Sequence, residues 1–407
     1  MAERTDGTPV HVDAAYERLL HTLALATFLV FFQAYMVAPL IPRLATLFGT
    51  SPVTAGIVVP AYLVPYGLTT LLVGVLADRM GRRRLMLGSL GLFTLLAPMT
   101  ATSRTVWEFA SWRAVTGIGV SAVVPLALSL IGVRYPYASR GRPLGWIFGA
   151  MAGGMAAGST LGAVLEPVLG WRGEFIALGI LSLPVGGLLL RDRALLDIGP
   201  RSHVPLVAVA AGYRALLTSA RGKATYLFVL LNAVFHSGVF TWLGLYFTVR
   251  HGLGVVGIGL ALLGYGLPGF VLGPVIGRAA DRWGRRWLIP GGLAIAAIAA
   301  LLLIPRSPIA AAAIVVTGLS LGYDMTQPLL AGVVTSLGAS RGGQAMGLNV
   351  FLLFIGFGLG SYAFGQLATY GLETALLVFG TLQLLLAGLA VSLFRGERAQ
   401  SADPANM

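Results

Sequence analysis

Twelve long apolar runs constrain the fold of this chain more than any other feature of its sequence. A helix needs about 20 apolar residues to cross the roughly 30 Å of hydrocarbon in a bilayer, and each run is close to that length. Because no water in the bilayer core can satisfy exposed backbone groups, such runs must be helical. The sequence therefore predicts an all-α polytopic membrane protein with twelve transmembrane helices. The runs cover residues 20–42, 54–77, 85–102, 107–133, 143–166, 174–190, 224–249, 255–277, 288–304, 309–336, 345–368 and 374–394.

Basic residues fall mainly in one of the two sets of loops that twelve spans define. The termini and every second loop hold 22 of them, the other loops hold five, and Arg113 alone lies inside a span. Loops rich in lysine and arginine remain cytoplasmic, so we expect both termini in the cytoplasm. The net charge of +13 then reflects topology, and no nucleic-acid partner is expected. Arginine outnumbers lysine 27 to 1, which is typical of a GC-rich bacterial source, so we expect a multi-pass protein of the bacterial inner (cell) membrane.

The second half of the chain repeats the first. The pattern Gly-x-x-x-Asp-Arg-x-Gly-Arg-Arg, which begins at Gly74, returns 203 residues later at Gly277, and Gln33 matches His236 at the same offset. The sequence therefore predicts two pseudo-symmetric six-helix bundles in the same orientation, which flank a substrate path near mid-membrane. We expect an N-terminal tail, a first bundle, a cytoplasmic linker, a second bundle and a C-terminal tail at residues 1–19, 20–190, 191–223, 224–394 and 395–407.

At this repeated loop the sequence resembles the major facilitator superfamily, over residues 20–394. The resemblance implies the fold of that family and a gating role for both loops, in which each aspartate faces the start of a helix in the opposite half, where the helix dipole is positive. Asp78 would face the eleventh helix near Gly343, and Asp281 the fifth near Pro143. The alternative is that the loops only retain topology through their arginines. The matching gating-loop residues are Gly74, Asp78, Arg79, Gly81 and Arg82 in the first copy and Gly277, Asp281, Arg282, Gly284 and Arg285 in the second.

Two further segments are similar to bacterial twelve-helix efflux members of the drug/proton antiporter type. Gly149, Gly158 and Gly162 match an antiporter signature on the fifth helix, although serine and alanine replace its proline and last glycine. The segment 170–175 resembles the start of the sixth helix in bacterial efflux members. The three glycines form an antiporter hinge or simply allow close helix packing, because small residues let helices approach each other.

Arg113 and Asp324 are the ionisable residues placed well inside spans, on the fourth and tenth helices. Charged side chains there are costly and usually functional. Asp324 shares one helical face with Thr317, Ser320 and Gln327, and this polar stripe could line a wet cavity. Asp324 is our candidate for proton coupling, with a satisfied aspartate that joins helices as the alternative. Arg113 could bind an anionic substrate, tune Asp324 or reach the outer face, and the resemblance associates it with proton coupling.

Polar and aromatic side chains on several spans are candidates to line the central substrate cavity. Each of them alone could instead pack between helices or anchor the membrane interface. The candidates are Gln33, Tyr35, Trp146, Asn232, His236, Trp242, Tyr323, Gln327 and Asn349.

The leading functional hypothesis is a secondary transporter that works by alternating access and exports small amphipathic or drug-like molecules in exchange for protons. One alternative is a proton-coupled uptake symporter or a facilitator for an organic anion or sugar. Another, from outside the transporters, is a transport-dead membrane sensor or a membrane enzyme. The sequence has no zinc-protease, nucleophile-elbow or P-loop motif, so we expect no enzymatic activity, cofactor or metal. We expect a monomer whose partners are the substrate, protons and the lipid bilayer.

Overall fold

A computed structural model describes residues 14–135, 141–197, 206–337 and 342–397 of the chain. All secondary structure in this described part is helical, and a helix coincides with each of the twelve apolar runs. The prediction of an all-α fold is therefore confirmed.

The first half of the chain forms six membrane-length segments, several of which are divided. Its elements are α1 (Ala14–Tyr35), η1 (Ala38–Leu40), α2 (Ile41–Leu47), α3 (Pro52–Gly56), α4 (Pro60–Met80), α5 (Arg82–Thr100), α6 (Val106–Val120), α7 (Val123–Arg134) and α8 (Gly141–Arg191). Element α8 contains both the fifth and the sixth run. The two runs meet at Gly170, where the chain bends sharply and φ is 66°. A positive φ of this kind is readily available only to glycine.

The second half repeats this arrangement after a short connection. The linker contains η3 (Arg193–Leu196) and α9 (Leu206–Thr218). The remaining elements are α10 (Ala220–His251), α11 (Val255–Ala261), α12 (Leu267–Trp283), α13 (Arg285–Leu302), α14 (Ile309–Asp324), α15 (Gln327–Leu337), α16 (Gly342–Ala368) and α17 (Leu372–Leu393).

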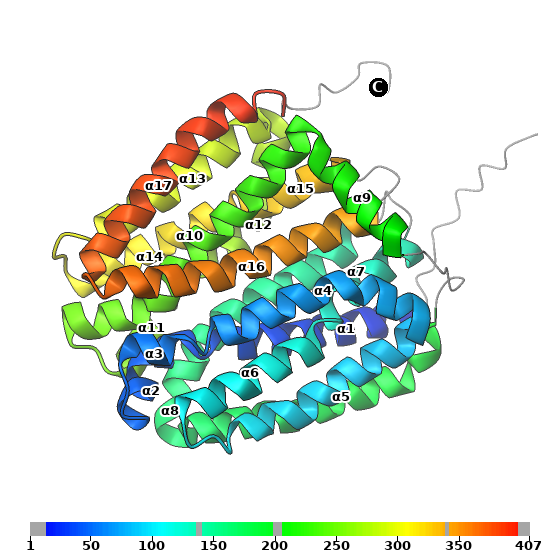
Figure 1. Cartoon of the computed structure of the whole chain (residues 1–407), viewed down its shortest axis with the longest axis horizontal. Helices are drawn as coiled ribbons and strands as arrows, with labels where there is room; N and C mark the ends of the chain where they lie inside the picture. The colour runs from blue at the N-terminus through cyan, green and yellow to red at the C-terminus, as the bar shows by residue number, and fades with distance from the viewer. Residues whose placement is uncertain (1–13, 136–140, 198–205, 338–341, 398–407) are drawn as a thin grey trace, which may run out of the picture.

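The helices gather into two bundles that follow the two halves of the sequence. Figure 1 shows α1 to α8 in one group and α10 to α17 in the other, with α4 and α16 side by side where the groups meet. The contacts of α8 with α11 and of α10 with η1 also join the two bundles. Sites formed between the bundles can therefore change when one bundle moves against the other.

Nine helical segments of the described residues are long and apolar enough to cross a membrane by length and composition. Three of the twelve predicted spans are not counted separately. One is joined to its neighbour within α8, α5 begins with three arginines, and the eighth run is divided between α11 and α12. The described helices are consistent with twelve spans.

Several spans are interrupted within their length, which the sequence analysis did not anticipate. The first span breaks between α1 and α2, the second between α3 and α4, the fourth between α6 and α7, the eighth between α11 and α12, and the tenth between α14 and α15. Prolines lie at the start of several of the new helices, including Pro60 in α4 and Pro268 in α12. Proline is favoured in the first turn of a helix, so these residues were the available signal for the breaks.

Candidate substrate site and coupling residues

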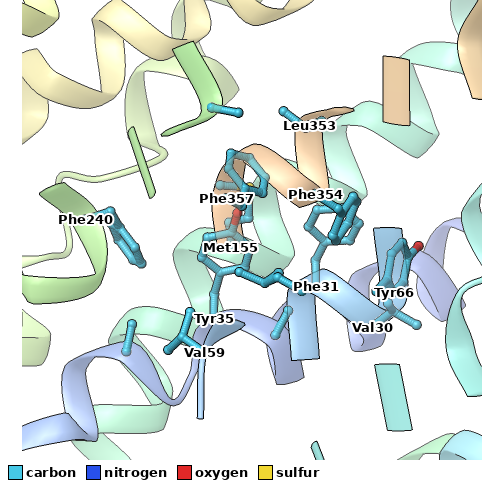
Figure 2. Packing of buried hydrophobic residues seen from close by; sticks show 14 of the residues in the cluster. Val30, Phe31, Tyr35, Val59, Tyr66, Met155, Phe240, Leu353, Phe354 and Phe357 are labelled. Carbon is cyan, nitrogen blue, oxygen red and sulfur yellow. The ribbon is translucent and has the colours of Figure 1, made fainter. Parts of the chain in front are cut away.

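A cluster of aromatic rings lies where the two bundles meet. Tyr66 of α4 stacks on Phe354 of α16, with 4.0 Å between the ring centroids. Tyr35 of α1 lies 5.5 Å from Phe240 of α10 and contacts Phe357 of α16 edge-on at 6.3 Å. Figure 2 shows these rings gathered between helices of both halves. We call Phe31, Tyr35, Tyr66, Phe240, Tyr265, Tyr323, Phe354 and Phe357 the ring cluster.

Several of the predicted cavity residues have buried polar atoms without hydrogen-bond partners. Both amide atoms of Gln33 and both ring nitrogens of His236 are buried and unpartnered. The imidazole of His236 lies edge-on to Tyr323, with 4.9 Å between the centroids. The hydroxyl of Tyr35 and the amide oxygen of Asn349 also lack partners. Because an unpaired buried polar group is costly, such atoms mark places where a ligand or water could bind.

Arg113 is fully buried, but its guanidinium is occupied by the protein backbone. Its Nη1 donates to the carbonyl of Gln33 at 2.9 Å, its Nη2 to Ala34 at 3.1 Å and its Nε to Val58 at 3.2 Å. Its carbon Cζ also lies 4.3 Å from the centroid of the Tyr62 ring. The three carbonyls flank the breaks in the first and second spans, where helical hydrogen bonds are missing. Arg113 therefore joins two interrupted helices, and it makes no ion pair with any described carboxylate.

Asp324 lies against the break in the eighth span. The backbone N–H of Gly269, in the first turn of α12, donates to its carboxylate. The Ser320 hydroxyl donates to Asp324 Oδ2 at 3.3 Å and accepts from the N–H of Gly266 at 2.8 Å. A carboxylate at a helix N-terminus is stabilised by unpaired N–H groups and the helix dipole. Thr317, two turns before Asp324 on α14, contacts Gly264 in the same break.

Gln327 separates from the rest of the predicted polar stripe, because the helix ends at Asp324 and restarts as α15. Its amide oxygen accepts from Nδ2 of Asn232 at 3.2 Å, and Asn232 also donates to Thr326 at 2.9 Å. Gln383 of α17 completes this buried network by donating to Asn232 at 3.0 Å. The sequence analysis missed Gln383, although an amide in the apolar twelfth span was a visible signal.

The two tryptophans predicted to line the cavity lie outside the ring cluster. Trp242 is buried, its indole N–H donates to the carbonyl of Ser361 at 2.8 Å, and its ring lies against Gly56 and Gly365. Gly56 belongs to the first bundle and Gly365 to the second, so Trp242 fills a slot between the bundles. Trp146 is largely exposed and contacts His21 edge-on at 4.8 Å.

The glycines of α8 differ in what they contact. A Cβ atom added to Gly158 would lie 2.5 Å from the carbonyl oxygen of Phe32, and one added to Gly162 would lie 2.7 Å from Cβ of Met36. Gly149, in contrast, has no neighbouring atom within 4 Å of such a Cβ. Gly158 and Gly162 thus allow close packing of α8 against the first span, whereas Gly149 does not take part in that packing.

The two copies of the predicted gating loop adopt the same backbone conformation. Gly81 and Gly284 separate consecutive helices at φ values of 88° and 80°. Arg79 and Arg282 are exposed, and Arg285 lies against Gly332. The side chains of Asp78 and Asp281 lie outside the residues that the structure describes, so their expected contacts with Gly343 and Pro143 stay predictions.

Three ion pairs lie on the side of the molecule where the described part of the chain begins at α1 and finishes after α17. Arg142 pairs with Glu17 near the start of α8, and Arg221 pairs with Glu397 at the start of α10. Arg18 donates to both carboxylate oxygens of Asp192 at 2.8 and 2.6 Å, and these hydrogen bonds hold the pKa of Asp192 below its usual value. We call this the terminal end and the opposite one the far end.

The bundles pack closely toward the far end. A Cβ on Gly259 of α11 would lie 2.9 Å from Cβ of Ala163, and one on Gly266 would lie 2.6 Å from Cβ of Ala156. We call these contacts of α8 with the eighth span the far-end seam. Gly145 near the start of α8 and Gly273 of α12, which lie nearer the terminal end, have open space at their Cβ positions.

A family model described as the Major Facilitator Superfamily matches residues 23–264 and 251–406. The MFS-type transporter YwfA of Bacillus subtilis is 25% identical over 378 residues, which is 91% of each chain. A chloramphenicol resistance protein of Streptomyces lividans is 28% identical over 322 residues, which is 77% of this chain and 80% of the relative. A crystal structure of a D-xylose-proton symporter has a TM-score of 0.72 at 17% identity and covers 93% of this chain and 97% of its own.

Proposed function

This chain belongs to the Major Facilitator Superfamily, and from that premise we propose that it exports small amphipathic molecules in exchange for protons. The observation that carries the proposal is the ring cluster, which places aromatic and unpartnered polar groups of both bundles at their contact. Amphipathic molecules have both an apolar body and polar atoms, so both parts find partners there. The similarity to a chloramphenicol resistance protein supports export of such compounds.

Transport would proceed by rocking of the two bundles around the ring cluster. The close contacts at the far-end seam support a state that is closed at the far end. With both termini in the cytoplasm, this state faces inward. Opening to the other side then requires separation of α8 from α11.

Asp324 is the proposed coupling acid. Its carboxylate is held by the first turn of α12, and residues just before that turn form part of the far-end seam. Protonation removes the negative charge and with it the attraction between Asp324 and the helix N-terminus. A change in the protonation of Asp324 would thus alter the strength of its interaction with the start of α12, and with it the position of the residues of the far-end seam.

Uptake of an organic anion or a sugar is the second candidate function. The similarity to the D-xylose-proton symporter structure supports a common fold and does not favour a sugar as the substrate. The anion version would use Arg113 as its partner. The three backbone carbonyls bound by its guanidinium argue against that use.

Reconstituted liposomes with an internal pH dye provide the test. Addition of chloramphenicol and related amphipathic compounds should move protons in the direction opposite to the compound, and Asp324→Asn should abolish this coupled movement. Glu373→Gln is the control, because Glu373 is an exposed carboxylate at the start of α17 and its ion pair with Arg250 lies outside both gating loops. If compounds cross without proton movement, or if Asp324→Asn behaves like the wild type, coupling through Asp324 is wrong.

A further inference from the structure

We infer that the ring cluster binds an organic cation, whose positive group pairs with Asp324 while its apolar body packs against the rings. This inference rests on the proposed transport function and names the substrate class of the same site. Neutral amphipathic compounds such as chloramphenicol still find the rings, but we expect them to bind more weakly because they gain no ion pair.

The carboxylate of Asp324 has no basic partner in the described part of the chain. It accepts from the hydroxyl of Ser320 at 3.3 Å and from the backbone N–H of Gly269 at the start of α12. A carboxylate offers about four acceptor positions, so these two donors leave others open. The buried Arg113 is bound by three backbone carbonyls and does not supply the missing positive charge.

Three tyrosines from both bundles lie close to this carboxylate. The charge of Asp324 acts electrostatically on Tyr265 and Tyr323, and Tyr35 of the first bundle is close enough to interact with both of these tyrosines. The hydroxyl of Tyr35 is buried and has no hydrogen-bond partner. Phenolic oxygens accept hydrogen bonds, and the faces of aromatic rings attract cations. An ammonium group beside Asp324 would therefore find both acceptors and ring faces.

Apolar rings continue the site away from the carboxylate. The ring of Phe240 lies 4.4 Å from that of Tyr265, and the ring of Phe357 lies 6.3 Å from that of Tyr323, measured between centroids. Figure 2 shows Phe240 and Phe357 gathered with Tyr35 in the same part of the molecule. Asp324 itself is only partly buried, so part of its surface is open to a ligand. The positive end of a ligand can thus reach Asp324 while its body contacts the rings.

The charge at this place favours a cation over compounds of other charge. An anion would be repelled by Asp324, and a neutral compound would leave the carboxylate without a partner. A cation loses hydration when it enters the site, but the ion pair and the ring faces offset this loss. In the proposed exchange, the proton and the cation would then occupy the same carboxylate in turn.

Equilibrium binding to the purified protein in an uncharged detergent tests the inference. The panel has one aromatic body, a naphthylmethyl group, which carries a trimethylammonium group, a tert-butyl group of the same shape or a sulfonate. Affinities are corrected for the partition of each compound into empty micelles. We expect the trimethylammonium compound to bind at least about tenfold more tightly than the other two. Equal or tighter binding of the tert-butyl compound or the sulfonate, or no binding of the trimethylammonium compound, would overturn the inference.

Variants of Asp324 locate the cation. Asp324→Asn should weaken binding of the trimethylammonium compound about tenfold and leave the tert-butyl compound unchanged, which shows that the site is still folded. Asp324→Glu keeps the charge and should retain the preference for the cation. Glu373→Gln, which removes the same charge from an exposed position, is the control and should bind like the wild type. A preference that persists in Asp324→Asn, or that is lost in an Asp324→Glu protein that still binds the tert-butyl compound, would contradict the ion pair.

Tyr35→Phe gives an independent readout, because it removes only the unpartnered hydroxyl. The primary ammonium of naphthylmethylamine can donate to this hydroxyl, whereas a trimethylammonium group has no N–H. We expect Tyr35→Phe to weaken binding of the primary compound about fivefold to tenfold and to leave the trimethylammonium compound nearly unchanged. Tyr370→Phe, at an exposed tyrosine, is the matched control. Unchanged binding of the primary compound, or equal weakening of both, would contradict a ligand position beside Tyr35.

Binding in detergent requires neither a proton gradient nor a defined direction of transport, so the two proposals can fail separately. Binding of the trimethylammonium compound through Asp324 without proton movement in liposomes would support this inference and contradict the proposed function. Proton-coupled transport of the tert-butyl compound in preference to the trimethylammonium compound would support the proposed function and contradict this inference.

Discussion

The guanidinium of Arg113 completes the hydrogen bonding of two interrupted helices. Its three carbonyl partners lie at the end of α1 and in the break between α3 and α4. Non-helical backbone is tolerated at membrane depth only where protein or water satisfies it. The planar fork of arginine can reach several acceptors at once, which a lysine ammonium on a flexible chain does less well. Arg113 thus allows the first two spans to bend beside the ring cluster.

Replacing Arg113 should therefore lower the stability of the fold more directly than it lowers the affinity for substrate. We expect Arg113→Met to lower the free energy of unfolding by about 3 kcal/mol, because it leaves three buried carbonyls without donors. Arg113→Lys should lie between this variant and the wild type. Chemical unfolding in detergent, followed by circular dichroism, measures both. A stable Arg113→Met protein that has lost only substrate binding would instead assign Arg113 to the ligand.

The sequence identified the unusual polar residues but could not say what each of them contacts. Arg113 and Asp324 stand out because charged residues are rare in spans, yet they lie at different helix breaks and form no ion pair with each other. The predicted stripe that ends at Gln327 assumed a continuous tenth helix. The break after Asp324 directs Gln327 to Asn232 instead. Periodicity cannot reveal such a break, although Pro328 directly after Gln327 was a signal for it.

Helix α8 shows how glycine position controls packing between elements. Gly154, Gly158 and Gly162 lie one turn apart and face the backbone of the first span at distances that leave no room for a side chain. Gly145 and Gly149 belong to a second stripe on the same helix, which has open space at its Cβ positions. The sequence analysis treated Gly149, Gly158 and Gly162 as one set, because spacing alone does not reveal which face of a helix meets a neighbour.

Two substitutions on α8 separate packing from helix propensity. Gly158→Ala should lower the free energy of unfolding by about 2 kcal/mol, because its methyl group would collide with the backbone of Phe32. Gly149→Ala should be neutral or stabilising by up to about 1 kcal/mol, since alanine favours helix and the space is open. Thermal unfolding in detergent compares the two. Equal effects would contradict the assignment of only one stripe to packing.

At the scale of the whole molecule, the two bundles reproduce the repeat in the sequence. The order and direction of the helices were predictable, because twelve apolar runs and two copies of one loop define them. Equivalent glycines, Gly81 and Gly284, adopt the same conformation in both copies. The close packing at the far end was not predictable, because contacts such as Gly259 with Ala163 join segments that no motif connects.

The far-end seam can be locked chemically because the chain contains no cysteine. In the double variant Ala163→Cys with Gly259→Cys, the Cβ atoms would begin 2.9 Å apart, so only a small outward shift is needed to reach the roughly 3.8 Å typical of a disulfide. Oxidation should cross-link α8 to α11 and reduce transport in liposomes by at least about tenfold, since a disulfide resists separation of the bundles. Reduction should restore transport, and each single-cysteine variant should be insensitive to oxidant. A fully cross-linked protein that still transports would show that the bundles do not separate at this seam.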